Sequence, residues 1–167
     1  MVLKGRVFKF GDDISTDHII PGRFFHLRSN LPELAQHTLE DVDPEFVSRV
    51  KPEDFIVAGR NFGLGSSREH APLVIKTVGV SAILVQSVAR IFFRNAINIG
   101  LPVLICDTGN IDAGDELTVD MANGTVENIT KGTRLEFNKF PDVMLKILGE
   151  GGLLPYIKRY GDFTIYD

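Results

Sequence analysis

The chain has 167 residues, of which 44% are hydrophobic and 24% are charged, values that are ordinary for a single globular domain. Its net charge of −4 gives no electrostatic reason to expect nucleic-acid binding. No apolar run reaches the length of a membrane span, and the N-terminus carries no apolar segment of the signal-peptide type, so we expect one cytoplasmic domain over residues 1–167.

The first predicted elements frame a long irregular segment. Apolar and polar residues alternate over residues 6–10, which predicts a strand, and Gly11 with two aspartates then turns the chain. Residues 23–52 are polar and irregular, with one short helix expected near 32–39. Because so long a segment without regular structure is uncommon in a compact domain, we expect 23–52 to be a functional loop or insertion.

The remaining sequence predicts an α/β fold that ends in a β-rich part. Apolar runs at 55–58 and 81–86 predict buried strands, and residues 71–78 repeat apolar positions at helical spacing. The segment after Ser87 predicts another helix, which Gly100 ends. Beyond residue 107 we expect a hairpin of 115–120 with 125–129 around Asn123 and Gly124, then helices near 142–149 and 154–160.

A glycine-rich turn between the strand at 55–58 and the helix at 71–78 carries the strongest chemical signal. Gly63 and Gly65 allow sharp turning and close approach to a ligand. Ser66, Ser67 and Arg68 follow, and a guanidinium can grip a carboxylate or phosphate with two hydrogen bonds. The spacing fits neither a nucleotide P-loop nor a dinucleotide fingerprint. Serines before a helix are also common N-caps, so the residues alone leave an anion site and a plain helix cap both open.

Three ordered motifs resemble the swivelling domain of the aconitase family. They lie at residues 16–21 (TDHIIP), 65–71 (GSSREHA) and 87–95 (SVARIFFRN), and the similarity runs from about residue 4 to about 160. The chain resembles the free-standing small subunits of the isopropylmalate dehydratase and homoaconitase type. That resemblance implies a three-layer β/β/α swivelling domain within the α/β class.

The resemblance also implies roles for individual residues. Ser66, as an alkoxide, would be the catalytic base that removes a proton from the substrate carbon. Ser67 and Arg68 would hold a substrate carboxylate, and Thr16 and Asp17 would be further substrate-binding residues. The implied reaction is a dehydration followed by a rehydration that moves the hydroxyl group of a small 2-hydroxy di- or tricarboxylate.

Cysteine content bears on the cofactor. Enzymes of this family use a four-iron–four-sulfur cluster, and such clusters are held by several cysteine thiolates. This chain has only Cys106, which follows an apolar run and is more typical of a buried small side chain than of a ligand. We therefore assign no metal to the chain, and the resemblance implies that a large subunit carries the cluster and that the chain alone is inactive.

Arg28 divides the possible substrates. In the family, the loop that contains it reaches the far end of the substrate, so that 23–52 would be the substrate-specificity insertion. A neutral residue suits the isopropyl group of isopropylmalate in leucine biosynthesis, whereas an arginine suits the distal carboxylate of homocitrate-type substrates. Alternatively, Arg28 points to solvent or to the large subunit. We place the leucine role first, with homoaconitase or a dual-specificity enzyme as the alternative, and a non-catalytic carboxylate-binding module as a further one.

Two other sets of residues keep open roles. Arg90 and Arg94 lie one helical turn apart and face either an anion, a partner's acidic surface, or solvent with local carboxylate partners, the last being the more common case. Asp17 and His18 fit a helix or turn cap. His18 is otherwise unassigned, and His70 is expected to be structural.

Overall fold

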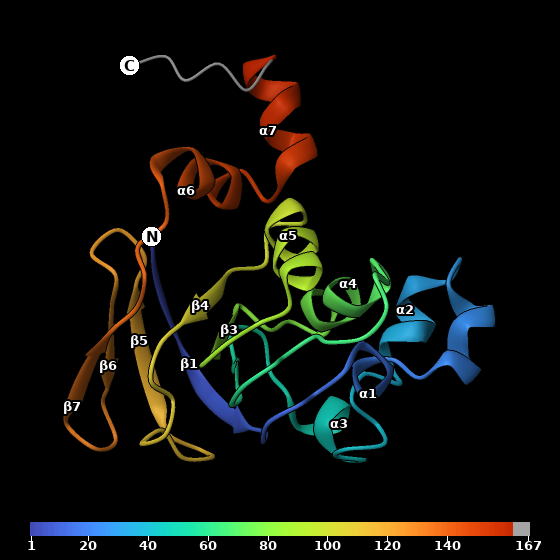
Figure 1. The fold of residues 1–167 in the computed structure, drawn as a ribbon, viewed down its shortest axis with the longest axis horizontal. Coiled ribbons are helices and arrows are strands. Elements are labelled where there is room, and N and C mark those ends of the chain that lie inside the picture. The colour runs from blue at the N-terminus through green and yellow to red at the C-terminus, as the bar shows by residue number, and fades with distance from the viewer. Residues whose placement is uncertain (162–167) are drawn as a thin grey trace.

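The computed structural model describes residues 1–161 and consists of one mixed sheet with helices on one face and at one end (Figure 1). The strands are β1 (Val2–Lys9), β2 (Phe55–Val57), β3 (Ala82–Val85), β4 (Val103–Ile105), β5 (Glu116–Asp120), β6 (Thr125–Asn128) and β7 (Thr133–Glu136). The helices are α1 (Thr16–Ile19), the 3-10 helix η1 (Gly22–Leu27), α2 (Leu31–Ala35), α3 (Phe46–Arg49), α4 (His70–Thr77), α5 (Arg90–Asn98), α6 (Asp142–Gly149) and α7 (Leu153–Tyr160).

The seven-stranded sheet has the order β4-β3-β2-β1-β5-β6-β7. Strands β1 to β4 pair in parallel, and β5, β6 and β7 continue the sheet as antiparallel neighbours. Parallel neighbours need crossover connections: the one from β1 to β2 contains α1, η1, α2 and α3, the next contains α4, and the one from β3 to β4 contains α5. Because the parallel strands point the same way, the segments that follow β1, β2 and β3 all leave from one edge of the sheet.

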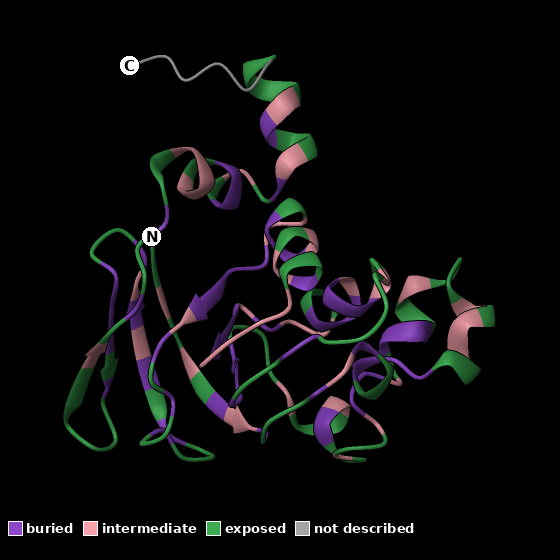
Figure 2. Ribbon diagram, in the orientation of Figure 1, coloured by how far each residue is buried: buried purple, intermediate pink, exposed green. Residues whose placement is uncertain are grey.

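Two hydrophobic cores lie on the two faces of β1–β4. Side chains alternate along a strand, so Ile56 and Ile83 enter the core with α1–α4, whereas Phe55 and Leu84 enter the core with β5, β6 and α6. Strands β2 and β3 are therefore buried along their whole length (Figure 2). Because β5 and β6 share the second core with β2 and β3, the parallel and the antiparallel strands of the sheet form two layers. The helices over the first core form the third layer, which confirms the three-layer α/β fold.

Most predicted elements are confirmed, but two regions differ. Strand β7 was not predicted, because its residues are mostly exposed and give no alternating hydrophobic pattern. The segment 23–52 is also more structured than expected, because η1, α2 and α3 fall within or overlap it and Leu34, Leu39 and Phe46 are fully buried in the helical core. None of the helices in residues 1–161 is both long and apolar enough to cross a membrane.

Side-chain contacts hold the 23–52 segment in place. Arg23 forms a two-pronged ion pair with Asp41, with nitrogen–oxygen distances of 2.8 and 2.5 Å. The hydrogen bonds from Arg23 lower the pKa of the Asp41 carboxyl. One residue further, Phe24 stacks on His37 with ring centroids 3.8 Å apart. These contacts tie the start of the segment to its middle, so η1 has a defined position.

A buried carboxylate fastens the β5–β6 hairpin to the preceding turn. Asp115 Oδ2 accepts hydrogen bonds from Asn128 Nδ2 at 2.8 Å and from the Asp112 amide at 2.9 Å. Burial opposes ionisation of this carboxyl group, but these hydrogen bonds and the charges of Lys131 and Lys9 outweigh burial and lower its pKa. The ionised form is therefore favoured in the folded chain.

We predict an acid-sensitive contribution to stability at this position. A lowered folded-state pKa stabilises the protein above the unfolded value of about 4, and this contribution is lost as pH falls through the folded pKa. Asp115→Asn should reduce the free energy of unfolding by about 1–3 kcal/mol at pH 7, with the difference shrinking below pH of about 4. Urea denaturation at both pH values measures this. Asp112→Asn, whose side chain is 70% exposed, is the control and should change little; an equal loss in both variants contradicts the prediction.

Candidate active site

The site forms where the segments after β1 and β2 meet beyond the edge of the sheet. Residues 14–16 run parallel to residues 63–64: the Gly63 amide donates to the Ile14 carbonyl at 2.7 Å, and the Thr16 amide donates to the Leu64 carbonyl at 2.8 Å. This short pairing extends the β1–β2 contact past the regular strands. It places the start of α1 beside the glycine-rich turn, although 50 residues separate Thr16 from Ser66.

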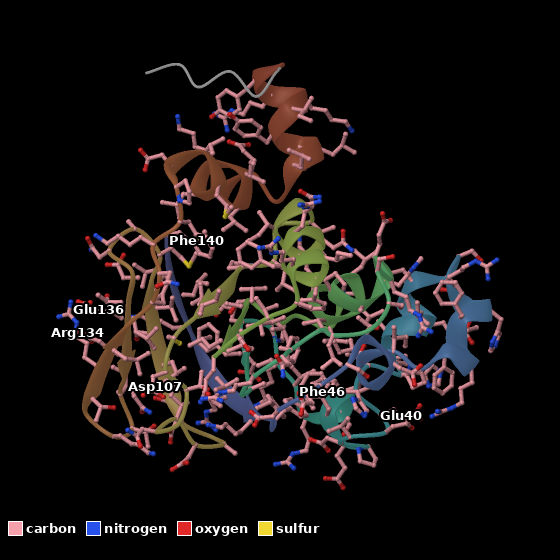
Figure 3. All side chains as sticks on the ribbon, in the orientation of Figure 1. Glu40, Phe46, Asp107, Arg134, Glu136 and Phe140 are labelled. Atoms are coloured by element: carbon pink, nitrogen blue, oxygen red, sulfur yellow. The ribbon has the colours of Figure 1, made fainter. Side chains whose placement is uncertain are left out.

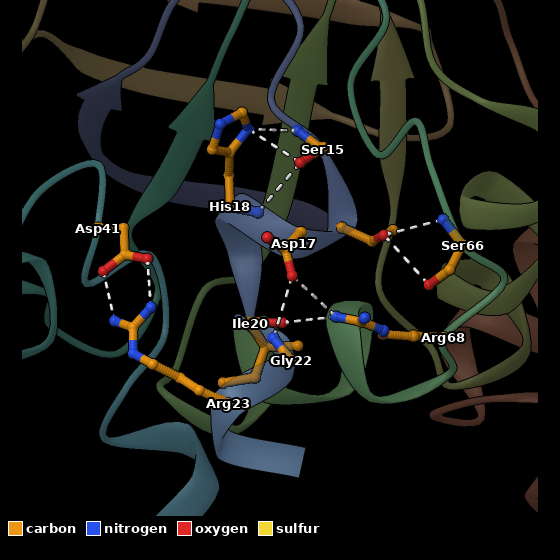
Figure 4. Close-up of polar contacts among 10 residues, drawn as sticks. Ser15, Asp17, His18, Ile20, Gly22, Arg23, Asp41, Ser66 and Arg68 are labelled. Carbon is orange, nitrogen blue, oxygen red and sulfur yellow. Dashed lines mark hydrogen bonds and ion pairs between the residues drawn. The ribbon is translucent and has the colours of Figure 1, made fainter.

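Thr16 positions Ser66 through its hydroxyl group. The Ser66 amide donates to Thr16 Oγ1 at 3.1 Å, and the two hydroxyl oxygens lie 3.4 Å apart (Figure 4). Thr16 is only 3% exposed, whereas Ser66 and Ser67 are exposed. The base candidate is therefore anchored by its backbone, and its hydroxyl stands at the surface with a second hydroxyl close enough to donate to it.

Arg68 is the cation of the site, and Asp17 holds its guanidinium group in place. Asp17 Oδ1 accepts from the Gly22 amide at 3.0 Å and lies 3.3 Å from Arg68 Nη1, which also donates to the Ile20 carbonyl at 3.1 Å (Figure 4). The Arg68 side chain is 26% exposed. Both Arg68 hydrogen bonds use Nη1. Within residues 1–161 Nη2 has no hydrogen-bond acceptor, so it is available to donate to a ligand.

His18 helps to cap the N-terminus of α1, the helix that carries Thr16 and Asp17. Ser15 is the N-cap of α1: its hydroxyl accepts from the His18 amide at 3.1 Å, and the Ser15 amide donates to His18 Nδ1 at 2.9 Å. These two bonds make a capping box with histidine in the place usually held by glutamate or glutamine. The prediction of a helix cap is confirmed for His18 but not for Asp17, whose carboxylate takes no part in the cap; the N-cap residue is Ser15, which was not predicted.

Phe25 brings Arg28 and Arg68 together. The guanidinium carbons of Arg28 and Arg68 lie 5.3 and 5.6 Å from the centroid of its ring, within the range of cation–π contacts. Arg28 Nη1 also donates to the Phe25 carbonyl at 3.1 Å, and His70 packs edge-on against the same ring at 5.6 Å. Phe25 was not predicted as a site residue; the signal that could have indicated it is an aromatic residue three positions before Arg28 in the predicted substrate-specificity insertion.

The glycines of the turn have specific steric reasons. Gly63 has a φ of +76°, and a Cβ there would lie 2.3 Å from the Phe92 ring. Gly65 has a φ of +113°, and its Cβ would lie 3.0 Å from Thr16 Oγ1.

The helix-cap interpretation of the serines is wrong, because α4 begins only at His70 and its N-cap position is Glu69.

The residues of this chain do not fit an iron–sulfur cluster. Its single cysteine, Cys106, is buried, and burial raises the pKa of the thiol to about 12. In the part of the chain that the structure describes, no group of three His, Cys, Asp or Glu residues is arranged to hold a metal ion.

Comparison with known proteins assigns the family. The protein-family model "Aconitase C-terminal domain" matches residues 14–107, which contain both segments of the site. A 3-isopropylmalate dehydratase small subunit from Archaeoglobus fulgidus is 63% identical over 99% of this chain and 100% of its own length. The chain belongs to the family of 3-isopropylmalate dehydratase small subunits. This family assignment confirms the resemblance noted from the three motifs.

Two further relatives agree with the assignment. A small subunit 1 from Thermotoga maritima is 55% identical over 97% of this chain and 98% of its own length. The solved structure of 3-isopropylmalate dehydratase (leuD) from Methanocaldococcus jannaschii has a TM-score of 0.92 and 42% identity, covering 96% of each chain. The family name also implies a large-subunit partner.

We predict that Gly63→Ala destabilises the protein by about 2–5 kcal/mol, because left-handed strain and collision with Phe92 add. Gly114→Ala is the matched control, since Gly114 has a similar φ of +83° with nothing within 4 Å of the added Cβ. It should lose only about 1–2 kcal/mol. Urea denaturation measures both, and equal losses would show that the Phe92 contact is unimportant.

Proposed function

We propose that this chain is the small subunit of a hydro-lyase that isomerises 2-isopropylmalate to 3-isopropylmalate by dehydration and rehydration in leucine biosynthesis. The observation that carries the proposal is the similarity to small subunits of this enzyme along nearly the whole chain. The close approach of the 16–17 and 66–68 segments supports it, because both belong to the predicted site.

In the proposed mechanism, the Ser66 alkoxide takes a proton from the substrate carbon next to the one that bears the hydroxyl group. Thr16 Oγ1, 3.4 Å from Ser66 Oγ, is placed to stabilise the alkoxide by donating its own proton in a hydrogen bond. Arg68 Nη2 and the Ser67 hydroxyl hold a substrate carboxylate, and Asp17 fixes the direction of the guanidinium. On rehydration Ser66 returns the proton.

The group that activates the substrate hydroxyl must come from elsewhere, because Cys106 is the only cysteine and its thiol is buried. We propose that a large subunit carries a four-iron–four-sulfur cluster and completes the site. Without that partner, the chain is expected to be inactive.

We predict that Ser66→Ala lowers turnover of the reconstituted complex by about 10²–10⁴-fold, because the proton acceptor is lost. Substrate binding, measured by calorimetry, should stay close to that of the wild type. Ser48→Ala is the control, since in residues 1–161 the Ser48 hydroxyl makes one hydrogen bond, to the carbonyl of Glu45 at the N-cap of α3. Near-normal turnover of Ser66→Ala would refute the role of base. Tight binding of a hydroxy acid without any partner, together with no turnover in its presence, would favour the non-catalytic carboxylate-binding module.

A second substrate is favoured by the position of Arg28. Its guanidinium shares the Phe25 ring with Arg68, so a second cation lies close to the proposed carboxylate site. We therefore keep homoaconitate, or dual specificity, as the alternative, with residues 23–52 as the segment that sets the preference.

We predict that Arg28→Val reduces kcat/KM for homoaconitate by roughly 10–100-fold, because a charge-assisted hydrogen bond to the distal carboxylate is lost. The value for isopropylmalate should be unchanged or higher. A substrate panel on the reconstituted enzyme gives both numbers, and equal effects on the two substrates would rule out a role in selection.

A further inference from the structure

Helix α5 presents an exposed stripe directly beside the site. Arg90, Ile91, Arg94 and Asn98 are exposed and form this stripe, because Arg94 follows Arg90 by four residues and Ile91 by three, and Asn98 follows Arg94 by four. Ile91 is 52% exposed, although isoleucine is one of the residue types most often buried in proteins. Leu64, 37% exposed, lies between Gly63 and Gly65 in the glycine-rich turn.

The helix that carries the stripe, α5, contacts the glycine-rich turn of the site. Asn95, on the adjoining side of α5, directs its Nδ2 to the Ser67 carbonyl at 3.4 Å. Phe92 packs under Gly63, where no Cβ fits, and the Ala89 amide donates to the Phe62 carbonyl at 2.9 Å just before the helix starts. One side of α5 therefore supports the glycine turn while the next side faces outward.

The charges of the stripe lack partners within the described chain. Arg90 and Arg94 have no carboxylate within 4.0 Å in residues 1–161, although they lie one turn apart and repel each other. The local carboxylates expected from the sequence are thus not found there. Within residues 1–161 five arginines have such partners (Arg6, Arg23, Arg49, Arg68 and Arg159), and Arg28, Arg60 and Arg134 also have none, so Arg90 and Arg94 differ by lying together one helical turn apart beside the site.

We propose that Leu64, Arg90, Ile91 and Arg94 form the docking surface for the cluster-bearing large subunit, with an apolar contact at Ile91 and acidic side chains of the partner facing the two arginines. The proposal rests on the proposed function. Ser66 and Ser67 lie at the surface, and the chain has one cysteine, so the group that activates the hydroxyl must be delivered over this face. A subunit that covers the serines also covers the adjoining stripe. Its composition matches interfaces, which are enriched in arginine and have an apolar centre.

The apolar contact is tested by Ile91→Asp in the full-length chain, with affinity for the large subunit of the same organism measured anaerobically by biolayer interferometry. We expect binding at least about 30-fold weaker than wild type, the loss typical of a central interface residue. Aspartate in the first turn of α5 is favourable for the helix, so the fold should be kept. Ile129→Asp is the matched control, because Ile129 is 54% exposed and follows β6, which lies in the layer away from the site.

The charged contact is tested by the double variant Arg90→Glu and Arg94→Glu. We expect slower association and a weaker dependence of the association rate on salt, since steering by opposite charges is lost. Arg134→Glu is the control, because Arg134 lies on β7, the edge strand at the antiparallel end of the sheet, at the left of Figure 3 and away from α5. Amide hydrogen exchange on the wild-type chain provides a measurement without substitutions: α5 should gain protection when the large subunit is added.

The outcomes separate the two proposals. If the wild-type chain binds the large subunit but Ile91→Asp binds as tightly as Ile129→Asp, or α5 gains no protection, the docking surface is wrong and the proposed function stands. If the wild-type chain binds no large subunit and shows no turnover with it, the proposed function itself fails.

Discussion

The site depends on a short parallel pairing between residues 14–16 and 63–64, beyond the end of the regular sheet. Two backbone hydrogen bonds, from Gly63 to Ile14 and from Thr16 to Leu64, bring together segments that are far apart in the sequence. Because the pairing uses backbone atoms, it sets the distance between α1 and the glycine turn within narrow limits. The position of Ser66 relative to Thr16 follows from this constraint, as does the reach of Arg68 to Asp17.

The fold could be predicted from the sequence mainly where burial leaves a periodic pattern. Strands β2 and β3 are continuous apolar runs because both of their faces lie in cores, and α4 and α5 show helical spacing because one face of each is buried. Strand β7 is mostly exposed and carries no such pattern. The structure of the 23–52 segment was difficult to predict for another reason. Individual side-chain contacts, such as the ion pair of Arg23 with Asp41, hold it in place, and such contacts leave no periodic pattern in the sequence.

The candidate site followed from the sequence in a similar, partial way. The motifs indicated Ser66, Ser67, Arg68 and Asp17, but the motifs alone did not place Asp17 against Arg68. The contact of Arg28 and Arg68 with one aromatic ring could not be derived, because it depends on how η1 packs against the start of α4, where Phe25 contacts His70. His18 was ambiguous for the same reason, since a capping role becomes visible only once the helix boundary at Ser15 is known.

The shared ring of Phe25 has a consequence for how such an enzyme can diverge. One arginine on the ring would serve the carboxylate that all substrates of the reaction have in common, and the other would serve the group that distinguishes them. Any change that tilts or shrinks the ring alters the surroundings of both cations at once. With these proposed roles, a lineage that adapts to a new acid would exchange residue 28 more readily than the aromatic ring beneath it, because a change at residue 28 leaves the arginine for the common carboxylate undisturbed.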